Sequence, residues 1–194
     1  MKSISGLNFA VIIPARYAST RFPGKALAMI GGKYMVQRVY EQARKSVDKV
    51  YIATDDQRIF YAAESFGADA VFTSADHTSG TDRCAEAVKK IMAGTGEKID
   101  VVINVQGDEP FIKPEQIDLL KSCFSDKNVT LATLVRKTAQ GEDIFNPGRP
   151  KVILDVNKDA IYFSRAAIPH IRDHQSAQWS SMHSYYMHIG LYAY

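Results

Sequence analysis

The segment best suited to chemistry follows the first apolar run of the chain. After Phe9–Ala15 (FAVIIPA), the next loop places three cationic side chains, Arg16, Arg21 and Lys25, within ten positions. Small residues and Gly24 let backbone N–H groups approach a ligand, and this composition suits a polyphosphate. The loop has neither the GxxxxGK[ST] nor the GxGxxG pattern, which disfavours an ATPase or a dehydrogenase. A solvated basic loop is the alternative interpretation.

A second loop, Ala75–Arg83 (ADHTSGTDR), precedes a run with helical periodicity. Ser79 or Thr81 can cap the predicted helix, and the N–H groups of its first turn attract electron-rich ligand atoms. A plain helix cap without a ligand is the alternative. The other histidines are scattered, so His77 has no partner at metal-ligand spacing.

A third loop, Asn104–Pro110 (NVQGDEP), overlaps the end of the clearest apolar run, Asp100–Val105. Asp108 can hold a hard divalent cation that bridges phosphate oxygens, and Gly107 clears space beside it. The alternative is that Asp108 is simply a solvated acidic residue in a turn, because a single carboxylate does not make a complete Mg²⁺ site without phosphate and water ligands.

Alternating apolar patterns predict the elements that must position these loops. Strand-like runs occur at Phe9–Ala15, Val50–Ala53, Ala70–Thr73, Asp100–Val105 and Val129–Val135. Helical spacing occurs between them, for example at Met35, Val36, Val39, Tyr40 and Ala43. This order predicts a three-layer, Rossmann-like α/β sandwich with a mostly parallel sheet, because parallel neighbours need a crossover helix. Ligands of such sheets bind at the carboxyl ends of strands, where these loops begin.

Past Gln140 the pattern changes to a β-hairpin, with Lys151–Val156 and Ala160–Ser164 joined by a short polar turn. The sequence shows no linker or internal repeat, and its length of 194 residues predicts one compact domain. At this size a single core needs no disulfide or metal to stabilise it. Cys84 and Cys123 lie in predicted helices without metal-binding spacing, so we expect both to be buried free thiols.

Composition and charge exclude several classes of partner. The formal net charge of +3 is too small to indicate a nucleic-acid surface. No apolar stretch approaches the ~18 residues of a membrane span, and the first residues carry no signal-peptide cleavage pattern. We therefore expect a cytoplasmic protein that binds neither nucleic acid nor membrane.

Five segments together resemble the 3-deoxy-manno-octulosonate (Kdo) cytidylyltransferases, or CMP-Kdo synthetases: IPARYASTRFPGK, ADHTSGTDR, NVQGDEP, YFSRAAIP and HIGLYAY. The resemblance covers nearly the whole chain and implies a nucleotide-diphospho-sugar transferase fold. It implies an enzyme in which the anomeric hydroxyl of Kdo attacks the α-phosphate of CTP, with Mg²⁺ as cofactor. The products would be pyrophosphate and CMP-Kdo for lipopolysaccharide synthesis. A homodimer is also implied.

The resemblance also implies roles for individual residues. Arg16, Lys25 and Asp108 would be catalytic, with Asp108 as the Mg²⁺ ligand. Substrate-binding residues would hold the triphosphate, the cytidine and the sugar acid: Ser19, Asp76, Ser79, Gly80, Arg83, Gln106, Arg165, His188 and Tyr192. Arg165 suits a carboxylate because its guanidinium can form a two-pronged contact. The alternative is a structural pairing of Arg165 with an acid such as Asp155.

Two departures from the family pattern leave alternatives open. The apolar run HIGLYAY stops at Tyr194, so residues 1–194 are expected to be one nucleotidyltransferase domain lacking the family's carboxy-terminal segment, which carries a second metal-binding Asp. Met187 also stands where the family often has a basic residue. The alternatives are a cytidylyltransferase for another sugar acid, either 8-amino-Kdo or a sialic acid, and a non-catalytic CTP-binding module. The stretch Tyr17–Thr20 favours the Kdo branch.

Overall fold

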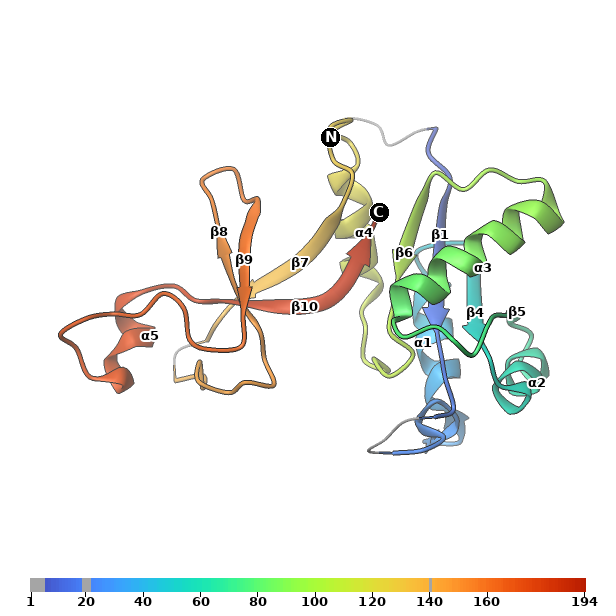
Figure 1. Cartoon of the computed structure of the whole chain (residues 1–194), viewed down its shortest axis with the longest axis horizontal. Coiled ribbons are helices and arrows are strands. Elements are labelled where there is room, and N and C mark those ends of the chain that lie inside the picture. The colour runs from blue at the N-terminus through green and yellow to red at the C-terminus, as the bar shows by residue number, and fades with distance from the viewer. Residues whose placement is uncertain (1–5, 19–21, 140) are drawn as a thin grey trace. The chain divides into compact units, whose positions relative to one another are not determined.

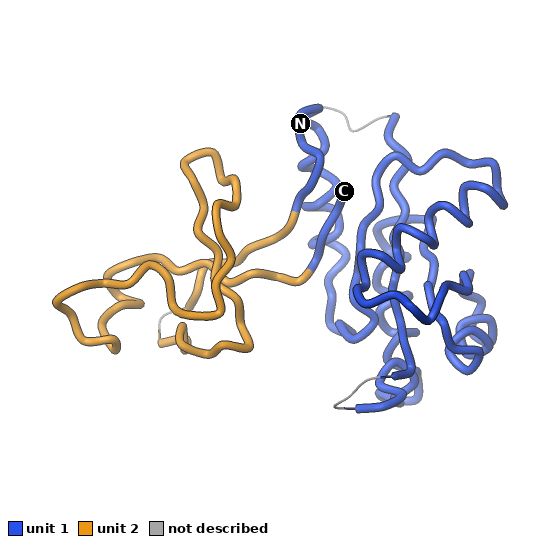
Figure 2. Tube along the Cα trace, viewed as in Figure 1, with its two compact units in different colours: residues 1–132, 191–194 blue, residues 133–190 orange. Residues whose placement is uncertain are grey.

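The computed structural model describes residues 6–18, 22–139 and 141–194, and it divides into two compact units (Figure 2). The first unit comprises residues 1–132 and 191–194, and the second comprises residues 133–190. The sequence does not predict this division. The expectation of one nucleotidyltransferase domain is not tested by it and stays a prediction.

The first unit alternates strands and helices in the predicted order (Figure 1). Its elements are β1 (Phe9–Pro14), η1 (Lys25–Leu27), β2 (Met29–Ile30), β3 (Lys33–Tyr34), α1 (Met35–Ala43), β4 (Val50–Thr54), α2 (Gln57–Ser65), β5 (Asp69–Phe72), α3 (Gly80–Thr95), β6 (Val101–Asn104) and α4 (Pro114–Cys123). The second unit contains most of β7 (Ala132–Lys137), then β8 (Lys151–Leu154), β9 (Ala160–Ser164), η2 (Ser176–Gln178), α5 (Trp179–Met182) and most of β10 (Tyr186–Ala193). The first residue of β7 and the last residues of β10 belong to the first unit.

A parallel sheet in the order β5-β4-β1-β6 forms the centre of the first unit. In its register, Val11 of β1 lies opposite Val50 on one side and Ile103 on the other. The last residues of β10 then pair antiparallel with β6, with Tyr192 opposite Asn104. The predicted mostly parallel α/β sheet is therefore confirmed.

Helices cover both faces of this sheet, which makes three layers (Figure 1). Alternate residues of β1 point to opposite faces. Ala10 and Ile12 pack in one core with Cys84 and Ala87 of α3. On the other face, Phe9 makes an edge-to-face contact with Phe124, which directly follows α4. Because β1 is buried on both faces, its sequence is a continuous apolar run rather than an alternating one.

Two sequence predictions need correction. The strand expected at Val129–Val135 is β7, which begins only at Ala132, because Asn128 N–H and Val129 N–H bond back to Asp126 and form a turn. Cys84 is buried as expected, but Cys123 is only partly buried; both are free. The segment between β1 and α1 also contains η1 and the β2–β3 pair, which the apolar pattern does not predict.

The second unit contains the predicted hairpin, with β8 and β9 antiparallel and Val152 opposite Phe163. Its turn is closed by Asp155, whose Oδ1 accepts N–H bonds from Asn157 and Asp159 at 2.8 Å each. A separate apolar cluster gathers around Trp179, Tyr185 and Met187. None of the helices in the described residues of either unit is long and apolar enough to cross a membrane.

Candidate functional site

A cavity of about 500 Å³ lies in the first unit, where β1 and β6 end and α3 begins. All three loops singled out in the sequence contribute to its wall. The lining residues are Pro14, Ala15, Arg16, Phe22, Lys25, Ala26, His77, Thr78, Ser79, Gly80, Arg83, Gln106, Gly107 and Asp108. The predicted placement of the loops at one edge of the sheet is therefore confirmed.

The loop after β1 folds back on itself before it delivers Lys25 to the cavity. Gly24 has a φ of 71° and donates its N–H to the carbonyl of Tyr17 at 2.9 Å. A Cβ at Gly24 would lie 3.0 Å from the Tyr17 ring, so glycine meets both a backbone and a packing need. The guanidinium of Arg58 in turn lies 3.3 Å from the centre of that ring. Two members of the predicted loop site, Ser19 and Arg21, lie outside the described residues.

Lys25 and Asp108 meet in the cavity although they are far apart in sequence. The Nζ of Lys25 lies 2.6 Å from Oδ2 of Asp108, and their side chains are 38% and 48% exposed. An ion pair this exposed adds little to folding stability. Its consequence is local, because it fixes a cation beside a carboxylate on the cavity wall.

Two glycines let the three loops approach each other. A Cβ on Gly107 would lie 3.1 Å from the carbonyl oxygen of Pro14, and one on Gly80 would lie 3.2 Å from Cγ of Pro14. The space expected beside Asp108 is thus used by the end of β1. Gln106, which directly precedes Gly107, is held by its Nε2, which donates to Oδ1 of Asn104 at 2.9 Å.

The loop before α3 contributes residues 77–80 to the cavity wall. Ser79 is the N-cap of α3, as the sequence allows, and its Oγ accepts the N–H of Asp82 at 3.1 Å. Asp76 differs from the other predicted residues of this loop. It is not among the lining residues, and its carboxylate accepts a hydrogen bond from Ser74 Oγ at 3.0 Å.

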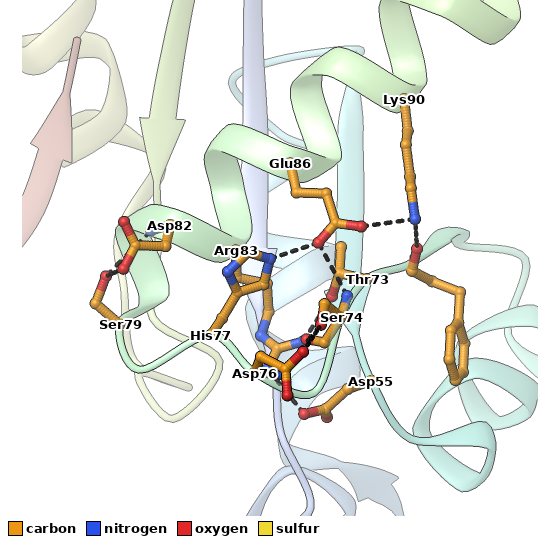
Figure 3. A network of polar contacts seen from close by, with 11 residues as sticks. Asp55, Thr73, Ser74, Asp76, His77, Ser79, Asp82, Arg83, Glu86 and Lys90 are labelled. Carbon is orange, nitrogen blue, oxygen red and sulfur yellow. Dashed lines mark hydrogen bonds and ion pairs between the residues drawn. The ribbon is translucent and has the colours of Figure 1, made fainter.

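Arg83 lines the cavity, but its guanidinium is directed toward Thr73 and Asp55 (Figure 3). The residue is 3% exposed. Its Nη1 donates to Thr73 Oγ1 at 2.5 Å, and its Nη2 pairs with Asp55 at 2.8 Å. The structure therefore gives Arg83 a buried structural pairing. Sequence reasoning missed Asp55, although it stands at the end of β4, where polar residues of a parallel sheet often serve the site.

The residues expected on the sugar-acid side do not lie in the cavity lining. Arg165 is exposed in the second unit, and its Nη1 donates to the carbonyl of Pro147 at 2.8 Å rather than to Asp155. His188, also in that unit, places Nε2 2.9 Å from Thr133 Oγ1, and burial lowers its pKa. Tyr192 belongs to the first unit, where burial raises its pKa.

The described residues contain no cluster of three or more His, Cys, Asp or Glu side chains that could enclose a metal ion. Mg²⁺ does not require one, because it is usually held by one or two carboxylates together with substrate phosphates and water. Asp108 is half-exposed on the wall of a cavity that also presents Arg16 and Lys25. This donor set fits an ion that arrives with a polyphosphate.

Comparison with known proteins decides the family. A family model described as cytidylyltransferase matches residues 10–194, which is nearly the whole chain. The chain belongs to this family.

Relatives with similar sequences show which group of this family the chain resembles. The chain is 54% identical over 192 residues to the 3-deoxy-manno-octulosonate cytidylyltransferase of Parabacteroides distasonis, covering 97% of this chain and 75% of the relative. It is 52% identical to the enzyme of the same name from Bacteroides thetaiotaomicron, with coverage of 97% and 75%. The resemblance drawn from the five sequence motifs is confirmed.

A solved structure agrees with these relatives. The structure of CMP:2-keto-3-deoxy-manno-octonic acid synthetase complexed with CTP matches with a TM-score of 0.84 and 39% identity. The match covers 96% of this chain and 73% of that one. The nucleotidyltransferase fold expected from the sequence is therefore confirmed.

Proposed function

We propose that this protein transfers the cytidylyl group of CTP to Kdo, giving CMP-Kdo and pyrophosphate for lipopolysaccharide synthesis. The observation that carries the proposal is the meeting of Arg16, Lys25 and Asp108 in one cavity at the strand ends. Those residues supply the positive charge and the metal-binding carboxylate that a nucleoside triphosphate needs. The names of the relatives and the CTP-bound structural match support CTP and Kdo as the substrates.

The chemistry is a displacement at the α-phosphorus of CTP. The anomeric hydroxyl oxygen of Kdo forms a bond to this phosphorus, and the bond from phosphorus to the oxygen shared with the β-phosphate breaks. Pyrophosphate leaves with the electron pair, and the hydroxyl proton passes to solvent. Positioning and charge neutralisation dominate this class of reaction, so no nucleophilic side chain is needed. Arg16 and Lys25 would orient the triphosphate and offset its charge.

Asp108 would hold Mg²⁺, which when bound neutralises phosphate charge and makes the α-phosphorus more electrophilic. The contact between Nζ of Lys25 and Oδ2 of Asp108 places a cation directly beside this carboxylate on the cavity wall. Gln106 would lie beside both substrates. Arg165, His188 and Tyr192 remain the proposed sugar-acid residues.

Pyrophosphate release tests this function and its alternatives. With CTP and Mg²⁺, we expect release to depend on Kdo and to be much slower with 8-amino-Kdo or a sialic acid. Faster release with either other sugar acid would reassign the substrate. CTP binding without release with any of the three would favour the non-catalytic module.

Homodimer formation and a cytoplasmic location stay predictions. The hairpin of the second unit exposes large apolar side chains at Val156, Ile161 and Tyr162. A second copy of the chain could cover this surface, which supports the expected homodimer.

Replacing Lys25 by Ala is expected to weaken CTP binding by about 1.5–3 kcal/mol, because one charge-assisted contact to a phosphate oxygen is lost. Titration calorimetry in the presence of Mg²⁺ measures this change. Lys33→Ala is the control, since Lys33 pairs with Glu41 at 2.7 Å and is not among the cavity-lining residues. An unchanged dissociation constant in a folded Lys25→Ala variant would remove this loop from the site.

Arg165→Lys is expected to raise the KM for Kdo about tenfold while leaving CTP affinity nearly unchanged, because Lys cannot reproduce a two-pronged contact with a carboxylate. Steady-state kinetics with each substrate varied in turn measures both effects. Arg172→Lys is a control in the same unit, where Arg172 pairs only with the adjacent Asp173 among the described side chains. Equal losses for both substrates would instead indicate a structural role for Arg165.

A further inference from the structure

The carboxylate of Glu86 ties the loop before α3 to that helix (Figure 3). Glu86 lies in the second turn of α3 and is not among the cavity-lining residues. Its Oε2 accepts the N–H of Ser74 at 2.9 Å and contacts Nε2 of His77. Its Oε1 pairs with Nζ of Lys90 at 2.7 Å. One side chain thus uses one oxygen for the loop and the other for its own helix.

The contact to Glu86 also determines which ring nitrogen of His77 carries a proton. Lys90, the Ser74 N–H and His77 together lower the pKa of Glu86 to about 2, so this carboxylate is ionised at neutral pH. An ionised carboxylate can only accept hydrogen bonds, so Nε2 of His77 must be the donor. The ring is therefore held in one orientation, with Nδ1 as the nitrogen that does not face Glu86.

The same oxygen fixes the loop at two points three residues apart. Between them, the N–H of Asp76 donates to Ser74 Oγ at 3.1 Å, which closes a local turn. His77 is followed directly by Thr78, Ser79 and Gly80, and residues 77–80 are part of the cavity wall. Fixing Ser74 and His77 therefore fixes the start of this wall against α3.

The negative charge of Glu86 does not by itself favour the binding of an anionic ligand in the cavity. The cavity presents Arg16 and Lys25, and a negative charge behind its wall weakens the attraction of these cations for an anionic ligand. Lys90, which pairs with the other oxygen of Glu86, offsets part of that effect. A favourable contribution of Glu86 to nucleotide binding must then come from its hydrogen bonds.

We propose that Glu86 is a positioning residue for the nucleotide, holding the His77 ring and the wall formed by residues 77–80 in the arrangement that binds CTP. Glu86 acts through His77 and the Ser74 N–H and does not itself touch the ligand. The inference rests on the proposed function, because it takes CTP as the nucleotide.

The variant Glu86→Gln distinguishes a positioning role from an electrostatic role, because the two roles predict opposite changes in the affinity for CTP. We expect CTP to bind about tenfold more weakly to the folded variant, because the acceptor that orders the loop is weakened. A purely electrostatic role predicts tighter binding instead. Lys90→Met is the matched control, since it leaves both contacts of Oε2 in place, and its dissociation constant should stay within about twofold of wild type.

A double-variant cycle tests the route through His77. We expect His77→Phe to weaken CTP binding, and Glu86→Gln to add less than about twofold in that background. The proposal would be overturned if the losses of CTP affinity in the two variants were additive. It would also be overturned if Glu86→Gln bound CTP as tightly as wild type or more tightly, or if Lys90→Met lost as much affinity as Glu86→Gln. If Glu86→Gln does not fold, Glu86→Asp keeps the charge with a shorter reach and should show the same weakening. Failure of the wild type to bind CTP would reject the proposed function instead.

Discussion

Asp108→Asn is expected to lower kcat for CMP-Kdo formation by about 100-fold or more, because charge stabilisation by a bound metal is worth several kcal/mol and each 1.36 kcal/mol is tenfold in rate. The amide keeps the shape of the side chain but loses the charge that a divalent cation needs. The melting temperature should hardly change, since the ion pair that Asp108 makes with Lys25 is about half exposed.

Turnover at saturating substrates over a range of Mg²⁺ concentrations, measured beside thermal unfolding, tests this expectation. Asp118→Asn is the matched control. Asp118 is a comparably exposed acid that pairs with Lys121 at 3.0 Å on α4 and does not belong to the cavity wall. Full turnover of Asp108→Asn at limiting Mg²⁺ would show that Asp108 is not the metal ligand.

Asp55→Ala should lower the free energy of unfolding by about 3–5 kcal/mol, because it leaves a buried guanidinium without its carboxylate partner. Arg83 is 3% exposed, and its Nη2 lies 2.8 Å from Asp55. Thr73 and the Ser74 carbonyl accept hydrogen bonds from Nη1 but supply no negative charge.

Urea unfolding measures the loss, and the neighbouring position provides the comparison. Asp56 pairs with the exposed Arg58 at 2.7 Å and caps α2 by accepting the Arg58 N–H. Removing such a cap costs about 1 kcal/mol, so Asp56→Ala should be clearly milder. If the two variants lost the same stability, the buried pair of Asp55 and Arg83 would not have the importance assigned to it.

The sequence predicts the central sheet well because its strands are buried on both faces. Phe9–Ala15 and Asp100–Val105 are continuous apolar runs, and they correspond to β1 and β6 at the middle of the sheet. The start of β7 is less predictable, since a turn stabilised by the side chain of Asp126 extends to Val129, the first residue of the apolar pattern, and the strand begins only at Ala132.

The sequence predicts the cavity residues whose position is set by the end of a strand. It does not predict the side-chain contacts that depend on partners far away along the chain. Arg16, Lys25 and Asp108 follow strands that end at one edge of the sheet, so their meeting follows from topology. The inward pairing of Arg83 does not, because Asp55 is 28 residues away along the chain. The contact between His77 and Glu86 likewise requires the loop to turn back onto α3.

Cytidylyl transfer from CTP to Kdo should depend on Asp108, and one labelling experiment tests this dependence directly. CTP carrying radioactive phosphorus at its α-position is incubated with Kdo, Mg²⁺ and the protein. We expect the label to appear in CMP-Kdo with an equal amount of unlabelled pyrophosphate, and to appear far more slowly with Asp108→Asn. The proposed reaction would be contradicted by label that stays in CTP or that is released as CMP without a sugar. The role of Asp108 would be contradicted by label that transfers equally fast with Asp108→Asn.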